Sequence, residues 1–139
     1  METTNKITVK TTINSPVAKV WSYWTLPEHI TKWCNASDDW HTPRAENNVK
    51  TGGKFLTRME AKDGSMGFDF EGEYDKIIPN KLIEYTIADG RKVSILFAEE
   101  GNGTSIAESF DPESENPLEM QQNGWQSILD NFKKYTESN

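Results

Sequence analysis

The stretch "NPLEMQQNGWQSILDNFKKY" (residues 116–135) decides the fold that this sequence predicts. Apolar side chains recur along one broad face at helical spacing, among them Trp125, Leu129 and Phe132. Asn116 and Pro117 are residue types that favour the start of a helix. The stretch therefore predicts one helix of about 20 residues, which is long for a globular protein.

Gly124 lies near the centre of this predicted helix, where glycine costs roughly 1 kcal/mol relative to alanine. It flanks the apolar face beside Trp125. A missing side chain there lets another part of the protein approach the helix, or it widens a cavity. We expect close packing against a sheet or against shorter helices, and a widened cavity is the alternative.

Residues 66–78, "MGFDFEGEYDKII", show the clearest alternation in the chain. Phe68, Phe70 and Tyr74 fall on one side, and acidic residues fall on the other. This period of two is typical of an antiparallel strand with one wet face. Similar but shorter patterns, separated by turn residues, predict further strands at residues 6–13, 44–50, 54–60, 82–87, 93–97 and 104–110.

Two short helices are predicted between the first strand and the rest, at residues 14–24 and 25–34, with a bend at Pro27. The order is thus strand, two helices, about six strands, and the long helix. A curved antiparallel sheet with one apolar face must be covered, and the long helix is the element large enough to do so. We therefore predict an α+β fold in which a curved sheet grips the C-terminal helix, within a single domain of residues 1–139.

Composition limits the class of protein. The chain has 139 residues, 35% of them hydrophobic and 11% aromatic, which suits one folded domain. The net charge of −7 argues against nucleic acid as a partner. No signal peptide and no run of about 20 apolar residues is present, so we expect a cytoplasmic protein without membrane insertion.

An aromatic-rich interior follows from the predicted strand faces and the helix stripe. Such a lining suits a planar, apolar ligand, although the same residues can simply fill a core at normal density. The candidate ligand-binding residues on these inner faces are Phe55, Met59, Phe68, Phe70, Tyr85, Phe97, Glu108, Phe110, Trp125, Leu129 and Phe132.

Glu108 is the candidate that carries a charge. Strand parity points it inward with Ile106 and Phe110. Burial would raise its pKa and would let it orient a ligand or act as a general acid or base. We expect instead a partly wet position at the rim of the sheet, or a strand bulge that reverses the parity.

Trp33 and Trp40 flank an irregular segment that could act as a lid over a pocket, and both are candidate ligand contacts. His41 follows two aspartates and could form an acid–base pair, but no nucleophile accompanies it. No metal site is predicted, because His29, Cys34 and His41 have no recognised ligand spacing. No cofactor motif is present either.

The chain resembles a known family through five motifs in order: "INSPVAKVW", "KTGGKF", "FEGEYDKIIPNKLIEYT", "GNGTSI" and "NGWQSILDNF". It is similar to homologues of the activator of the ninety-kilodalton heat-shock protein ATPase, within the SRPBCC superfamily of START and birch-pollen-allergen folds. The resemblance covers about residues 7–135 and implies a helix-grip fold with an internal cavity. It corresponds to one domain, without the second, N-terminal domain of the eukaryotic co-chaperones.

The resemblance also implies a range of functions, because members bind lipids, hormones or polyketides, a few are enzymes, and some act as co-chaperones. We predict a monomeric carrier or sensor without a cofactor that binds a small hydrophobic molecule between the sheet and the C-terminal helix. One alternative is a module that interacts with a chaperone. The other is a cyclase- or hydrolase-like enzyme on apolar substrates, for which Tyr85, His41 and Glu108 are the available polar groups.

Overall fold

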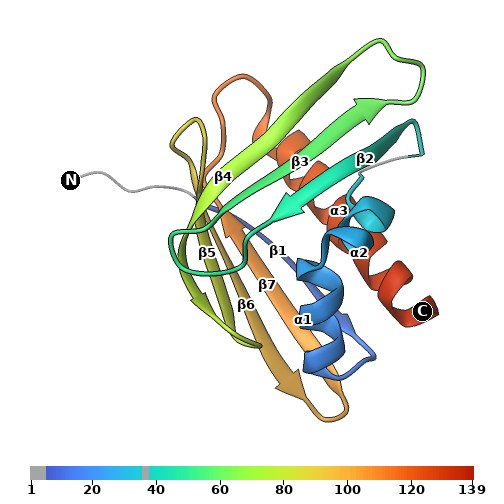
Figure 1. Ribbon diagram of the computed structural model, residues 1–139, viewed down its shortest axis with the longest axis vertical. Coiled ribbons are helices and arrows are strands. Elements are labelled where there is room, and N and C mark those ends of the chain that lie inside the picture. The colour runs from blue at the N-terminus through green and yellow to red at the C-terminus, as the bar shows by residue number, and fades with distance from the viewer. Residues whose placement is uncertain (1–5, 36–37) are drawn as a thin grey trace.

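The computed structural model describes residues 6–35 and 38–139, in which seven strands form one antiparallel sheet that curls around a long helix (Figure 1). The strands are β1 (Ile7–Ile13), β2 (Trp40–Asn47), β3 (Lys54–Ala61), β4 (Gly67–Ile78), β5 (Leu82–Ile87), β6 (Lys92–Glu100) and β7 (Gly103–Phe110). The helices are α1 (Val17–Thr25), α2 (Pro27–Trp33) and α3 (Leu118–Ser138). This is the α+β helix-grip fold that the order of elements predicts.

The strands lie in the order β1-β7-β6-β5-β4-β3-β2, and each pair of neighbours is antiparallel. Strands β2 to β7 form a meander, as their short turns predict. Strand β1 instead pairs with β7, at the opposite edge from β2. Because α1 and α2 connect β1 to β2, they bridge the two edges, and they share the cover of the concave inner face with α3 (Figure 1).

Period-two alternation sets the inner face of β5, β6 and β7. The side chains that the pattern points inward are all buried, whereas their neighbours are half-buried or exposed. The prediction of these inner faces is therefore confirmed for Ile83, Tyr85, Ile87, Val93, Ile95, Phe97, Thr104, Ile106, Glu108 and Phe110.

Helix α3 covers the inner face and is tied to β1 along its flank. Leu129 and Phe132 face the interior and are both 0% exposed. The Gln126 Nε2 atom donates to the backbone oxygen of Lys10 at 3.0 Å. Further along the helix, Lys133 Nζ donates to the backbone oxygen of Thr12, also on β1. Burial of the apolar stripe supplies the main stabilisation, at about 25 cal/mol per Å² removed from water.

An aromatic cluster fills the interior under the C-terminal half of α3. The ring centroid of Phe132 lies 4.8 Å from that of Trp24 and 4.8 Å from that of Trp33, in edge-on contacts. Trp24 also meets Phe97 edge-on, at 5.8 Å. Since these rings pack α3 against α1, α2 and β6 at this end, an open space in the interior has to lie under the N-terminal half of α3.

Strand β2 differs from the prediction, because it begins at Trp40 and not near residue 44. Trp40 pairs with Ala61 and His41 with Glu60, and a register shift follows before Arg44. Pro43 lies in this shift, and proline is tolerated at a bulge of an edge strand. The expectation of an irregular segment is therefore wrong for residues 40–43, whereas the strand predicted from residue 44 is confirmed over residues 44–47, and residues 36–37 lie outside the described part of the chain.

Two expectations for α3 are also wrong. Asn116 does not cap the helix, because its side chain donates to Glu113 Oε2 at 2.6 Å, and Pro117 occupies the N-cap without a side-chain cap. Gly124 is not a point of close approach: a Cβ atom built there meets no described atom within 4 Å. Among the helices of residues 6–35 and 38–139, none is long and apolar enough to cross a membrane.

Candidate ligand-binding cavity

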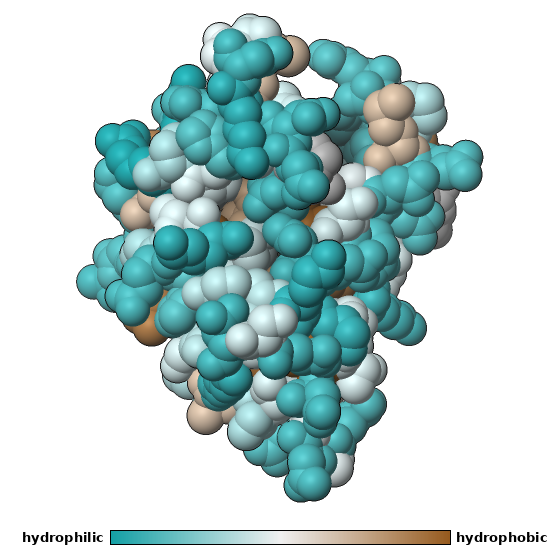
Figure 2. Space-filling model, turned by 90° about the vertical axis from the view of Figure 1, so that its right-hand side faces the viewer, coloured by the Kyte–Doolittle hydropathy of each residue, from teal (hydrophilic) through white to brown (hydrophobic). Residues whose placement is uncertain are grey.

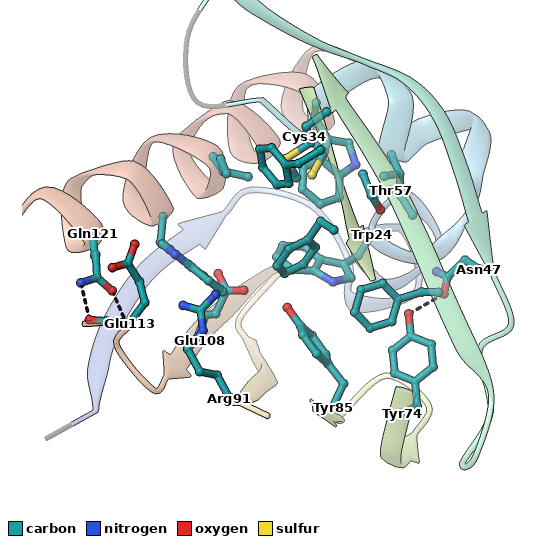
Figure 3. A pocket seen from close by; sticks show the side chains of 18 residues that line it. Trp24, Cys34, Asn47, Thr57, Tyr74, Tyr85, Arg91, Glu108, Glu113 and Gln121 are labelled. Carbon is teal, nitrogen blue, oxygen red and sulfur yellow. Dashed lines mark hydrogen bonds between the residues drawn. The ribbon is translucent and has the colours of Figure 1, made fainter. Parts of the chain in front are cut away.

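A cavity of about 270 Å³ lies between the inner face of the sheet and the N-terminal half of α3 (Figure 3). Its walls come from β2, β3, β4, β5 and β7, from both short helices and from α3. Most of its lining is aromatic or aliphatic. The lining residues are Trp24, Ile30, Trp33, Cys34, Asn47, Phe55, Thr57, Met59, Phe68, Phe70, Tyr74, Tyr85, Arg91, Glu108, Glu113, Gln121, Trp125 and Ile128.

Eight of the thirteen candidate residues from the sequence line this cavity: Trp33, Phe55, Met59, Phe68, Phe70, Tyr85, Glu108 and Trp125. Phe68 is 46% exposed, so the cavity reaches solvent near the β3–β4 hairpin. The structure brings these residues together from six elements. Their contact with a ligand stays a prediction.

The other five candidates lie outside the cavity lining. Phe97, Leu129 and Phe132 belong to the filled end of the core. Phe110 lies behind the Trp125 ring, and Trp40 lies on β2, with its ring centroid 6.0 Å from that of Phe68. Strand parity points a side chain inward, but it does not tell whether the side chain meets a neighbour or an open space.

Ten lining residues were not among the candidates. Thr57 and Tyr74 share the inward parity of their strands, and Ile128 shares the helix stripe, so a sequence signal for these three existed. Arg91 and Glu113 lie in connections after β5 and β7, where no periodicity applies. Their position at the cavity follows from the curl of the sheet, which the sequence pattern does not show.

Several polar groups at the cavity already have partners within the protein. The Tyr74 hydroxyl donates to Asn47 Oδ1, and Asn47 Nδ2 donates to the backbone oxygen of Thr25 at 2.7 Å. Gln121 Nε2 donates to the backbone oxygens of Glu113 at 3.1 Å and Asn116 at 2.8 Å. These bonds hold the walls in place, and they leave these side chains with few free hydrogen-bonding groups for a ligand.

Arg91 is also engaged at the edge of the cavity. Its Nε atom lies 2.9 Å from Asp89 Oδ2, and its side chain is 23% exposed. The guanidinium group keeps further N–H donors beyond this pair. Arg91 therefore adds positive charge at the side of the cavity where β5 turns into β6 (Figure 3).

Glu108 is buried inside the sheet, with 6% of its surface exposed. It pairs in regular register with Val9 of β1 and Ile95 of β6, so the expectation of a rim position or a bulge is wrong. Desolvation by burial raises the pKa of its carboxyl group to about 8. At neutral pH the group is therefore mostly protonated and can donate a hydrogen bond.

Burial also raises the pKa of two neighbours of Glu108. The pKa of Tyr85 lies well above its ordinary value, because of desolvation first and the charge of Glu108 second. The pKa of the Cys34 thiol rises to about 12 for the same two reasons. Glu108 thus influences both groups electrostatically, and all three side chains line the cavity.

His41 lies apart from this cluster. It is on β2, its Nε2 atom is 3.7 Å from Glu60 Oε1, and it does not line the cavity. The acid–base pair suggested for His41 with the preceding aspartates is replaced by this contact with β3. In the described residues no group of three or more His, Cys, Asp or Glu side chains is arranged to hold a metal ion.

Comparison with known proteins identifies the family. The family model described as "Activator of Hsp90 ATPase homolog 1-like protein" matches residues 14–137. A comparison with curated proteins finds no match. Among solved structures, an AHSA1-like protein from Aeromonas hydrophila is 41% identical, with a TM-score of 0.91 over 96% of this chain and 93% of that chain.

Two further solved structures have the same fold. A protein from Cytophaga hutchinsonii is 60% identical, with a TM-score of 0.84 over 96% of this chain and 93% of that chain. A protein from Chromobacterium violaceum is 20% identical and shares the fold alone, with a TM-score of 0.87 over 97% of this chain and 99% of that chain. Because the family match spans most of the chain, from the end of β1 to the end of α3, this protein belongs to the family of Activator of Hsp90 ATPase homolog 1-like proteins.

Proposed function

We propose that this protein binds a small, mostly hydrophobic molecule in the cavity between the sheet and α3. The observation that carries the proposal is the cavity of about 270 Å³ with a mainly aromatic and aliphatic lining. Natural cores are packed with few voids larger than a water molecule. A space of this size under a single helix is therefore a feature that a ligand would fill.

The volume favours a compact ligand. A dry cavity of about 150 Å³ accepts benzene, and pockets for drug-sized molecules begin near 300 Å³. The cavity lies between these values, which suits a molecule of two or three rings better than a long acyl chain. Flat rings such as Phe55, Phe70 and Trp125 line its walls and favour a planar ligand.

A titration followed by two-dimensional NMR tests this proposal. Labelled protein is titrated with fatty acids, sterols, flavonoids and polyketides, one compound at a time. We expect saturable shifts at Phe70, Trp125 and Tyr85, which line the cavity, and smaller shifts at Leu96, which is 55% exposed on β6. Uniform silence at the cavity residues would overturn the proposal.

A matched pair of variants separates cavity binding from surface binding. Thr57→Phe adds a ring at a buried cavity wall on β3, whereas Thr12→Phe adds the same ring at an exposed position on β1. We expect the Thr57→Phe variant to lose ligand binding and the Thr12→Phe variant to keep it. Equal loss or equal retention in both folded variants would contradict a ligand in the cavity.

The family description favours a second candidate, a module that acts on the Hsp90 chaperone. The face in Figure 2 is mainly hydrophilic, with hydrophobic atoms only in small scattered spots, so contact there would rely on polar side chains. The test is the rate of ATP hydrolysis by Hsp90 with and without the protein. A rate increase that Thr57→Phe leaves intact would support this candidate over the carrier.

An enzyme remains the third candidate, and the cavity chemistry limits it. Tyr85 and protonated Glu108 can donate hydrogen bonds to a substrate oxygen, as in an oxyanion site. His41, the expected base, lies outside the cavity lining. We expect a cytoplasmic monomer of one domain whose role is binding. If the protein converts a cavity ligand to a product, and Glu108→Gln abolishes this turnover, the binding role is overturned in favour of an enzyme.

A further inference from the structure

Tyr85 and Glu108 form the polar part of an otherwise apolar cavity wall. Tyr85 pairs with Val93, and Glu108 pairs with Ile95, so the two residues lie on strands separated only by β6 and offset by two positions along it. Both point to the inner face, and both line the cavity. Figure 3 shows the Tyr85 hydroxyl directed into the space beside Glu108.

Neither group is satisfied within the described part of the protein. No hydrogen bond joins the Tyr85 hydroxyl or the Glu108 carboxyl to another described residue, in contrast to Tyr74, Asn47 and Gln121 at the same cavity. Among the described residues, the one side-chain oxygen that is both fully enclosed and without a hydrogen-bond partner is Thr136 Oγ1. The Tyr85 and Glu108 oxygens have no partner either, so they are not fully enclosed and contact the open space of the cavity. A buried polar group without a partner is destabilising, so this pair is arranged for a hydrogen-bonding ligand.

The protonation states make both groups donors near neutral pH. Burial holds the Glu108 pKa at about 8, and no cation lowers it, although Arg91 is at the same cavity. The pKa of Tyr85 is raised as well, so its hydroxyl stays neutral. A ligand group that accepts two hydrogen bonds fits this pair, and a carbonyl oxygen has the two lone pairs required.

The charges around Tyr85 and Glu108 also favour a carbonyl oxygen over a cationic group. The titratable groups that line the cavity around Glu108 are Tyr74 on β4, Tyr85 on β5, Arg91 before β6, Cys34 after α2 and Glu113 after β7. Helix α3 contributes only amide and apolar side chains to the lining. Arg91 brings positive charge, Glu108 is mostly neutral, and the Glu113 carboxylate already accepts hydrogen bonds from Glu115 and Asn116, so an ammonium group is the less favoured ligand.

We propose that Tyr85 and Glu108 together form a two-donor site that selects an apolar, planar ligand carrying a carbonyl oxygen. This inference rests on the proposed ligand-binding function and adds the chemical class of the ligand. The two donors would orient the carbonyl end toward the sheet, and the rings would lie against Phe55, Phe70 and Trp125. The carbonyl group is bound at this site, and no chemical step is assigned to it.

Three probes of one skeleton test the selection: acetylnaphthalene, ethylnaphthalene and naphthylethylamine. Their affinities are measured by calorimetry, and the carbonyl stretching frequency of bound acetylnaphthalene is measured by infrared spectroscopy. We expect acetylnaphthalene to bind roughly tenfold more tightly than ethylnaphthalene, which is the effect of one to two net hydrogen bonds. We also expect its carbonyl frequency to fall on binding.

Variants assign the effect to the two donors. Glu108→Leu and Tyr85→Phe should each reduce the ratio of the acetylnaphthalene affinity to the ethylnaphthalene affinity several-fold, whereas Glu108→Gln keeps an N–H donor and most of this ratio. Tyr74→Phe is the matched control, because the Tyr74 hydroxyl already donates to Asn47. The preference should also fall as the pH rises through about 8 in the wild type, but not in Glu108→Gln.

The outcomes separate this inference from the proposed function. Equal binding of acetylnaphthalene and ethylnaphthalene, or a preference that survives Glu108→Leu and Tyr85→Phe together, would overturn the two-donor site and leave the hydrophobic carrier intact. Tightest binding of naphthylethylamine would replace it with a cation site. Failure of all three probes to bind folded wild-type protein would overturn both the carrier and the two-donor site.

Discussion

Phe110 of β7 and Trp125 of α3 stack face to face, with ring centroids 3.8 Å apart and ring planes 11° from parallel. Phe110 is 0% exposed, while Trp125 lines the cavity. One face of the Trp125 ring therefore holds α3 against the sheet, and the residue also forms part of the cavity wall. Helix position and cavity shape depend on the same contact.

Replacement of Trp125 should reveal this contact as a loss of stability. We expect Trp125→Ala to lower the free energy of unfolding by about 3 kcal/mol, because a large packed ring is removed. Trp125→Phe keeps an aromatic partner for Phe110 and should cost about 1 kcal/mol. Urea unfolding checks both values, and an alanine variant as stable as the phenylalanine variant would show that the stack contributes little.

Glu108 should make stability depend on pH. Its folded-state pKa, about 8, lies above the ordinary value of 4.5, so the folded protein keeps a proton that the unfolded chain releases. Stability from this group is thus fully present below about pH 4.5 and falls by about 1.4 kcal/mol per pH unit until about pH 8, where it levels off.

The variant Glu108→Gln should remove this component. We expect the variant to gain stability relative to the wild type as the pH rises from 5 to 8, because glutamine needs no proton to stay neutral. Urea unfolding at several pH values gives the difference directly. Parallel pH profiles for the two proteins would contradict a raised pKa at Glu108.

Gly124 should tolerate a methyl group with a gain in stability. A Cβ atom there meets no described atom, and alanine is favoured over glycine inside a helix, so we expect Gly124→Ala to add about 1 kcal/mol. Thermal unfolding measures the gain. A loss of stability would show that the space beside Gly124 is occupied in solution.

Cys34 should react slowly with thiol reagents in the folded protein. Its pKa of about 12 leaves very little thiolate at pH 8, and the thiolate is the reactive form. We expect alkylation by iodoacetamide to be at least tenfold slower than in protein unfolded by urea. The same rate in folded and unfolded protein would exclude a neutral, partly buried thiol.

Some features of the site could be predicted because they depend on local periodicity. Strand alternation places Tyr85 on the inner face and the helix stripe places Trp125 there, and each lies there. Alternation also points Glu108 inward, which is correct, whereas the expected rim position or bulge is wrong. The start of β2 was missed, since Pro43 and the register shift interrupt the pattern that marks a strand. Local signals fail where the chain departs from regular geometry.

Gly124 shows a second limit. Its sequence position marks an unusual absence of a side chain, but not what lies opposite. Close packing was the expected reason, and the structure has open space there instead. What faces a residue is decided by segments far away in the chain.

The sequence by itself determined the order of the elements, their inner faces and the helix that covers the sheet, because each follows from spacing between neighbouring residues. Only the tertiary structure decided that Phe97 packs in the core while Phe70 faces a cavity, since that depends on how side chains from several elements fill one volume. It also decided that Glu108 is buried and mostly protonated, because desolvation is imposed by residues distant in the chain.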